Sequence, residues 1–175
     1  MTMRNFHPVW TAHDTPLGPM ILAANDAGLL GAWFEGQRHF SGPQTHWVRE
    51  TDHALLREAG QQLDAWFARQ RDRFDLPLAP VGTPFQQQVW QALARIDFGI
   101  TQAYGQVARA IGRPQASRAV GAATGRNPWS IIVPCHRLLG HGGALTGYAG
   151  GLHRKQALLA FEGPEAVPLL LRDAA

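Results

Sequence analysis

Hydrophobic residues in the first half of the chain gather in short runs separated by turn sequences, a pattern typical of β-strands joined by tight turns. The turn sequences fall at residues 16–19 and 25–28. We expect three strands that form an antiparallel meander, over residues 9–13, 20–24 and 29–34. After a polar loop, residues 52–69 carry large apolar side chains at helical spacing, which predicts one amphipathic helix over the sheet.

The pattern changes to helices in the second half of the chain. Thr83 followed by Pro84 is a helix-start signal, because Thr caps a helix well and Pro is tolerated at its first position. We expect three helices here, over residues 84–93, 104–111 and 115–124. The last two flank a turn that contains Gly112 and Pro114, which is typical of a helix-turn-helix motif and also of helix hairpins in ordinary cores.

These elements predict an α+β protein. A small N-terminal α/β domain with an antiparallel sheet is expected to precede a mostly helical C-terminal domain that contains the helix-turn-helix. One further apolar run, residues 130–133, is predicted as a short buried strand or extended segment that ends at Pro134.

Composition narrows the function classes. The only cysteine among the 175 residues is Cys135, so an internal disulfide and sites that need two thiolates are excluded, and we expect neither a metal nor another cofactor. No apolar run approaches the roughly 20 residues that span a bilayer, and the first 30 residues lack the pattern of a signal peptide. We therefore expect a cytoplasmic protein without membrane association.

Basic side chains are concentrated in the second half. Residues 1–83 contain 7 basic and 9 acidic side chains, whereas residues 84–175 contain 9 basic and 4 acidic ones. This asymmetry favours a nucleic-acid-binding module attached to a neutral one. The alternative is a coding bias toward arginine, with the arginines solvated on an ordinary surface.

The helix expected at residues 115–124 is rich in small residues, which let a backbone approach a flat or grooved partner closely. Tight packing against another helix is the alternative. Arg118 favours an external partner, because an isolated Arg is rarely buried unpaired. The candidate DNA-binding residues are Gln115, Ala116, Ser117, Arg118, Ala119, Ala122 and Gly125.

Cys135 is followed directly by His136 and Arg137, and we expect these neighbours and the preceding helix to lower the pKa of its thiol. The alternative is an inert buried cysteine. Spacing excludes a phosphatase loop, which needs Arg six positions after the cysteine, where this chain has His141. A cysteine hydrolase with His136, His141 or His153 as base stays open.

Residues 127–137, Asn-Pro-Trp-Ser-Ile-Ile-Val-Pro-Cys-His-Arg, resemble the active-site signature of the bacterial type of O6-alkylguanine-DNA alkyltransferase. Other blocks that are similar to this family occur in the expected order, at residues 104–108, 118–123, 147–151 and 155–162. The segments 15–19 and 33–36 are similar as well. The resemblance therefore covers nearly the whole chain.

The resemblance implies DNA repair by direct damage reversal. A methyl or larger alkyl group would move from O6-alkylguanine in duplex DNA to Cys135, once per molecule, with O4-alkylthymine as an additional candidate substrate. His136 is implied to take the thiol proton through a water, and Glu162 to orient His136. Asn127 is implied to fix the turn that presents Cys135. Tyr104 is implied to hydrogen-bond the departing guanine.

The resemblance also implies that the damaged nucleotide is flipped out of the duplex, with Arg118 in its place and the small-residue helix in the minor groove. Arg109, Arg113 and Arg126 are candidates for phosphate contacts. The expected substrate pocket is lined by Tyr104, Val133, Pro134, Tyr148, Ala149 and Gly150. Because some relatives have Ser where this chain has Ala149, the pocket is expected to accept larger alkyl groups.

Residues 1–80 are thus expected to form a scaffold domain, and residues 81–175 the DNA-binding and alkyl-transfer domain. The expected partner is double-stranded DNA containing O6-alkylated guanine, bound by a monomer without an obligate protein partner. The alternative is an alkylation-damage sensor or regulatory DNA-binding protein without turnover. Sensors of that type lack the cysteine, whereas Cys135 is present here.

Overall fold

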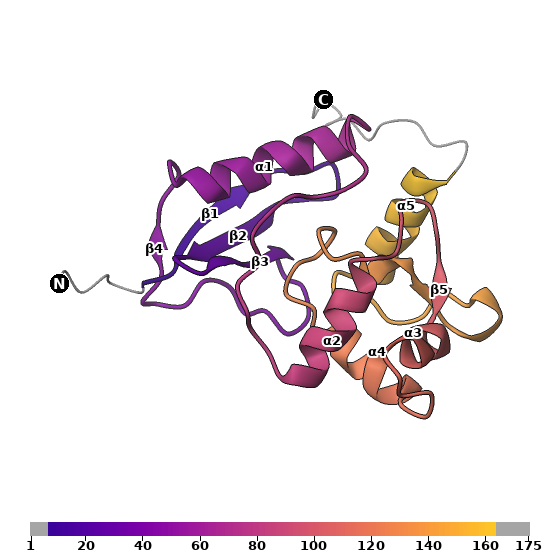
Figure 1. Ribbon diagram of the computed structural model, residues 1–175. Coiled ribbons are helices and arrows are strands. Elements are labelled where there is room, and N and C mark those ends of the chain that lie inside the picture. The colour runs from indigo at the N-terminus through magenta and orange to yellow at the C-terminus, as the bar shows by residue number, and fades with distance from the viewer. Residues whose placement is uncertain (1–6, 164–175) are drawn as a thin grey trace.

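The computed structural model describes residues 7–163 of the chain (Figure 1). A sheet with one long helix lies on one side of the molecule, and the remaining helices gather on the other (Figure 1). The expected α+β fold is confirmed. The parts of the two expected domains at residues 1–6 and 164–175 lie outside the described residues.

Four strands form the N-terminal sheet in the order β3-β2-β1-β4. Their bounds are β1 Val9–His13, β2 Met20–Asn25, β3 Gly28–Phe34 and β4 Val48–Arg49. Strands β1, β2 and β3 form the expected antiparallel meander. Strand β4 joins β1 in the parallel direction, so the sheet is mixed. With two residues, β4 is too short to leave a periodic signal in the sequence.

Helix α1 (Ala54–Phe67) packs along the sheet (Figure 1). Its buried apolar side chains recur at helical spacing, and they are Leu56, Ala59, Leu63, Trp66 and Phe67. The helix begins two residues after the start of the predicted range 52–69 and ends two residues before its end, which is the usual imprecision for helix ends.

Helix α2 (Pro84–Leu93) begins where the sequence predicts. The Oγ1 of Thr83 accepts a hydrogen bond from the N–H of Gln86 at 3.2 Å, and the Oε1 of Gln86 accepts one from the N–H of Thr83 at 2.9 Å. This reciprocal capping box satisfies two backbone donors that the first helical turn leaves unpaired.

The helix-turn-helix consists of α3 (Tyr104–Ala110) and α4 (Ser117–Gly125), which pack against each other. Helix α4 begins two residues later than predicted. The N–H of Ala116 donates to the carbonyl of Arg113 at 2.9 Å, and this bond closes a turn that delays the helix.

The strand predicted at residues 130–133 is wrong, because this buried segment is a turn. Ile131 has a φ of 71°, in the left-handed region that strand residues do not adopt. Two hydrogen bonds hold the turn against β3: Ala32 donates to the carbonyl of Pro128, and Ser130 donates to the carbonyl of Ala32, each at 2.8 Å. A short apolar run has the same pattern in a strand and in a buried turn, so the sequence could not separate them.

The turn leads into the 3-10 helix η1 (Cys135–Arg137), a short parallel pair of strands and the last helix. The remaining elements are β5 Gln102–Ala103, β6 Leu138–Leu139, the 3-10 helix η2 His141–Gly143, and α5 Leu152–Glu162. One continuous hydrophobic core joins both halves of the described chain. None of the helices within residues 7–163 is long and apolar enough to cross a membrane.

Candidate active site around Cys135

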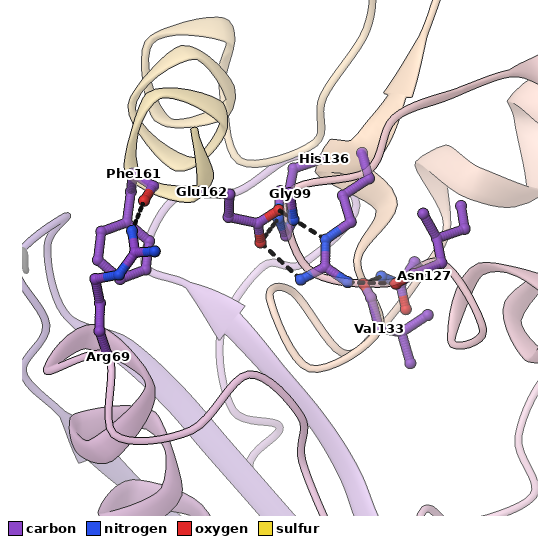
Figure 2. A network of polar contacts seen from close by, with 9 residues as sticks. Arg69, Gly99, Asn127, Val133, His136, Phe161 and Glu162 are labelled. Carbon is purple, nitrogen blue, oxygen red and sulfur yellow. Dashed lines mark hydrogen bonds and ion pairs between the residues drawn. The ribbon is translucent and has the colours of Figure 1, made fainter. Parts of the chain in front are cut away.

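Cys135 is the first residue of η1, and only 4% of its surface is exposed. The Nδ2 of Asn127 donates a hydrogen bond to its Sγ at 3.1 Å. It donates another to the carbonyl of Val133 at 2.9 Å (Figure 2). The Oδ1 of Asn127 accepts from the N–H of Trp129 at 3.0 Å. The amide of Asn127 therefore closes the turn and fixes the sulfur at its end.

Glu162, the last residue of α5, connects the buried polar groups next to Cys135 (Figure 2). Its Oε1 lies 2.8 Å from the Nε2 of His136. Arg137 donates to both carboxylate oxygens, from Nη2 at 2.7 Å and from Nε at 2.8 Å. The N–H of Gly99 adds a fourth contact at 3.2 Å. The buried carboxylate is thus paired and hydrogen-bonded, as a buried charge requires.

The pKa values of Glu162 and His136 indicate which atoms of this cluster carry protons. Burial raises the pKa of Glu162, but hydrogen bonds from His136 and Arg137 outweigh burial and bring it to about 2. The ionised carboxylate can only accept, so the imidazole proton of His136 is on Nε2. Burial lowers the pKa of His136 more than Glu162 raises it, so the imidazole is neutral at neutral pH. Its Nδ1 is buried without a hydrogen-bond partner among the described residues, which leaves its lone pair able to take up a proton.

The expected lowering of the pKa of Cys135 is wrong. Burial raises the pKa of the thiol, and the hydrogen bond from Asn127 and the charge of Lys155 oppose burial only in part. Arg137 does not act on the sulfur, because its guanidinium binds Glu162 and the carbonyl of Ile96. The resting group is therefore a thiol, and its reaction as a nucleophile requires a base.

Lys155 of α5 is fully buried, and its Nζ donates to backbone carbonyls. It binds the carbonyl of Thr146 at 2.7 Å and that of Leu138 just after η1. These bonds tie the start of the glycine-rich loop 147–151 to the segment that carries Cys135. Burial lowers the pKa of Lys155, and a negative charge on Cys135 opposes this shift.

A cavity of about 350 Å³ lies beside Cys135. Its walls include Tyr104 at the start of α3, Ala122 of α4, and Tyr148 and Ala149 of the loop. This volume is within the range of small-ligand sites. The cavity therefore brings the cysteine, the helix-turn-helix and three of the expected pocket residues together.

The other three expected pocket residues do not line this cavity. Val133 and Pro134 line a separate cavity of about 290 Å³. Gly150 lies behind Tyr148, where a Cβ would be 2.7 Å from the tyrosine ring. A glycine is therefore needed here for the ring to pack. In their place, Ala122 and Gly125 of α4 form part of the cavity wall; the sequence suggested both for DNA binding.

Helix α4 has one buried and one accessible side. Val120, Ala123 and Thr124 are buried in the core. Among the candidate DNA-binding residues, Gln115, Arg118, Ala119 and Ala122 are exposed, and Ala116, Ser117 and Gly125 are half-buried. The small side chains leave the backbone of this helix accessible to a partner.

Sequence reasoning missed the contribution of the N-terminal half to the site. Arg38 and His39 follow β3 and line the cavity together with Arg126. No local motif marks them, because long-range hydrogen bonds bring them there, among them the bond from the N–H of Arg38 to the carbonyl of Ala149 at 2.9 Å. In the described part of the chain, no cluster of three or more His, Cys, Asp or Glu residues is arranged to hold a metal ion.

Comparison with known families gives two matches that together span most of the chain. Residues 9–80 match the 6-O-methylguanine DNA methyltransferase, ribonuclease-like domain. Residues 84–164 match the 6-O-methylguanine DNA methyltransferase, DNA binding domain.

Individual relatives are similar over nearly their whole length. A methylated-DNA–protein-cysteine methyltransferase of Methanosarcina acetivorans is 48% identical over 86% of this chain and 95% of its own. One from Mycobacterium tuberculosis is 46% identical over 87% of this chain and 91% of its own. The crystal structure of Mycobacterium tuberculosis OGT in complex with DNA superposes with a TM-score of 0.82 at 43% identity, covering 94% of this chain and 98% of that one. With both domains matched, the chain belongs to the methylated-DNA–protein-cysteine methyltransferase family, the O6-methylguanine DNA methyltransferases.

Proposed function

We propose that this methyltransferase moves a methyl or larger alkyl group from O6-alkylguanine in duplex DNA to the Sγ of Cys135, and that each molecule acts once. The observation that carries the proposal is the position of the cysteine. Cys135 lines the same cavity as Ala122 and Gly125 of the accessible helix α4. A base that leaves a duplex bound at α4 can therefore reach the sulfur.

The polar cluster supports a displacement at carbon. The thiol proton passes through a water to the Nδ1 of His136, while ionised Glu162 accepts the Nε2 proton and stabilises the imidazolium. The thiolate then attacks the alkyl carbon, a C–S bond forms, and the C–O bond to guanine breaks with its electron pair going to the base. Tyr104 on the cavity wall hydrogen-bonds the departing base and stabilises the negative charge that develops on it. The base then takes up a proton from water, and the imidazolium of His136 returns its proton to water.

The roles of the remaining residues follow from this step. Asn127 holds the sulfur in position for attack. Arg118 fills the gap in the base stack, and the small residues of α4 let it enter the minor groove. The thioether has no easy leaving group, so Cys135 is not regenerated.

Several further properties belong to the proposal. Residues 1–80 act as scaffold and residues 81–175 as the DNA-binding and alkyl-transfer domain. The protein acts as a cytoplasmic monomer on double-stranded DNA, and O4-alkylthymine is a second substrate. Ala149 offers no hydroxyl to the substrate oxygen, which supports the acceptance of larger alkyl groups.

The experiment is to incubate the protein with a duplex containing O6-methylguanine and to map the modified peptide by mass spectrometry. The expected result is a gain of one methyl group on Cys135 and none in Cys135→Ala. A damage sensor without chemistry would bind the duplex and gain no mass, and a methyl group on any other residue would contradict the proposal.

A further inference from the structure

A loop of the N-terminal half is fixed at the entrance of the Cys135 cavity. Gln37 is buried, and its Oε1 accepts hydrogen bonds from the N–H of Phe34 at 3.0 Å and from the hydroxyl of Ser130 at 2.8 Å. The N–H of Arg38 donates to the carbonyl of Ala149 at 2.9 Å. These bonds attach the loop to both the Cys135 turn and the glycine-rich loop.

The backbone of this loop is strained at the next residue. His39 has a φ of 66°, in the left-handed region that residues other than glycine seldom adopt. Strain of this kind persists only where the surrounding structure fixes it, and it occurs often at ligand sites. Here it accompanies the placement of His39 on the cavity wall.

Three basic side chains meet at this entrance. Arg38 and His39 of the loop and Arg126 just after α4 are exposed, and all three line the cavity. None of them has a side-chain hydrogen bond or ion pair within residues 7–163, and no acidic residue lines the cavity. The pKa of His39 is lowered, first by partial loss of solvation at the cavity wall and then by the charges of Arg126 and Arg38, so both arginines lie within electrostatic range of His39. The unpaired charges of Arg38 and Arg126 repel each other, and an anion between them removes the repulsion, while the neutral imidazole of His39 can donate a hydrogen bond to the same anion.

The proposed reaction indicates which anion would be present. A guanine that points its O6 toward Cys135 leaves its sugar and the two flanking phosphates at the entrance. We propose, on the basis of the proposed function, that Arg38, His39 and Arg126 form a phosphate-binding rim that holds the backbone of the extruded nucleotide. Both halves of the chain then bind substrate, so the N-terminal domain holds the nucleotide backbone in addition to its role as scaffold.

The test compares two substrates in four variants. Arg38→Ala, Arg126→Ala and His39→Asn each remove one rim group, and Asn tolerates the left-handed backbone that residue 39 requires. Arg57→Ala, an exposed Arg of α1 outside the cavity, is the matched control. The second-order rate of alkyl transfer is measured with an O6-methylguanine duplex and with free O6-benzylguanine, which has no phosphate.

The rim predicts that each arginine variant lowers the duplex rate about tenfold more than the free-base rate, the usual effect of one lost charge-assisted hydrogen bond. Arg57→Ala should leave the ratio of the two rates unchanged. In a Cys135→Ala background, each lost arginine should also reduce the slope of log affinity against log salt by about 0.9.

Two results would overturn the rim. In the first, Arg38→Ala and Arg126→Ala leave the ratio of the two rates unchanged, as Arg57→Ala does. In the second, they lower the rates with both substrates equally, which would mean that these arginines shape the cavity and do not bind the DNA backbone. The free-base rate of the unmodified protein tests the proposed function separately, because it requires Cys135 and no rim group.

Discussion

At the scale of single residues, the arrangement of polar groups next to Cys135 depends on Glu162. Its carboxylate contacts His136, Arg137 and Gly99. Its pKa falls from 4.5 to about 2 on folding, although burial acts in the opposite direction. A lowered carboxyl pKa contributes stability above the unfolded value, and this contribution is lost as the pH falls toward the folded value.

We expect the native cluster to stabilise the fold by roughly 3 kcal/mol at neutral pH. This contribution should disappear between pH 4.5 and about 2. Glu162→Gln should lower the free energy of unfolding at pH 7 and remove most of its pH dependence in that interval, as measured by denaturant unfolding. The matched control is Glu35→Gln, at an exposed carboxylate. Equal pH profiles for Glu162→Gln and the unmodified protein would contradict this assignment.

The buried imidazole of His136 leads to a second prediction, which concerns the pH dependence of alkyl transfer. Its imidazole must be neutral to accept a proton, and burial lowers its pKa below 6.5. The rate with free O6-benzylguanine should therefore be constant from pH 7 to 8 and should fall only at a pH below 6.5. His136→Gln should be slow at every pH and lack this acid limb. A fall that begins above pH 7 would argue against a neutral, buried base.

Sequence reasoning identified Cys135, Asn127, His136 and Glu162 as one group, and the structure brings them together. It misassigned Arg137, which was expected to act on the thiol and instead binds Glu162. Adjacency in the chain does not determine the direction of a side chain, and in η1 successive residues point to different sides. The burial that raises the pKa of Cys135 is equally invisible in a local pattern.

At the scale of elements, α4 combines an exposed small-residue side with Arg118 in its first turn. Extruding a nucleotide costs a few kcal/mol, and a side chain that fills the gap recovers part of that cost. We predict that Arg118→Ala slows transfer from a duplex at least about tenfold more than transfer from free O6-benzylguanine. Arg57→Ala is again the control. Equal losses with both substrates would refute the stack-filling role.

Helix α5 positions the loop of the cavity through Lys155. Replacing it with Met removes the donor from the carbonyl of Thr146 and from the buried carbonyl of Leu138, and a buried carbonyl left unpaired costs about 1–3 kcal/mol. Lys155→Met should lower the free energy of unfolding by at least that amount and raise the KM for O6-benzylguanine. Unchanged unfolding and KM would show that the loop does not depend on this residue.

The long elements were predictable because their patterns are periodic, as for the three strands of the meander and for α1. The turn at residues 130–132 was not, because hydrogen bonds from β3 and from the side chain of Asn127 fix its conformation, and the apolar pattern of the segment reveals neither. The two-residue strand β4 has no periodicity to detect.

At the scale of the whole molecule, the two halves share one core and meet again at the active site. The Nε1 of Trp129 donates to the carbonyl of Leu29 in β3 at 2.8 Å, and its ring packs edge-on against Trp90 of α2. The Cys135 turn is therefore supported from both sides. This long-range support, like the approach of Arg38 to the cavity, lies outside what a local pattern can predict.

The central claim is that the sulfur of Cys135 accepts the alkyl group in a thioether that is not reversed. The most direct measurement is the number of methyl groups transferred per protein molecule from a tenfold excess of duplex containing O6-methylguanine. The account predicts a plateau at one methyl group per molecule, with no transfer by Cys135→Ala. Transfer that continues beyond one equivalent, or that persists in Cys135→Ala, would contradict it.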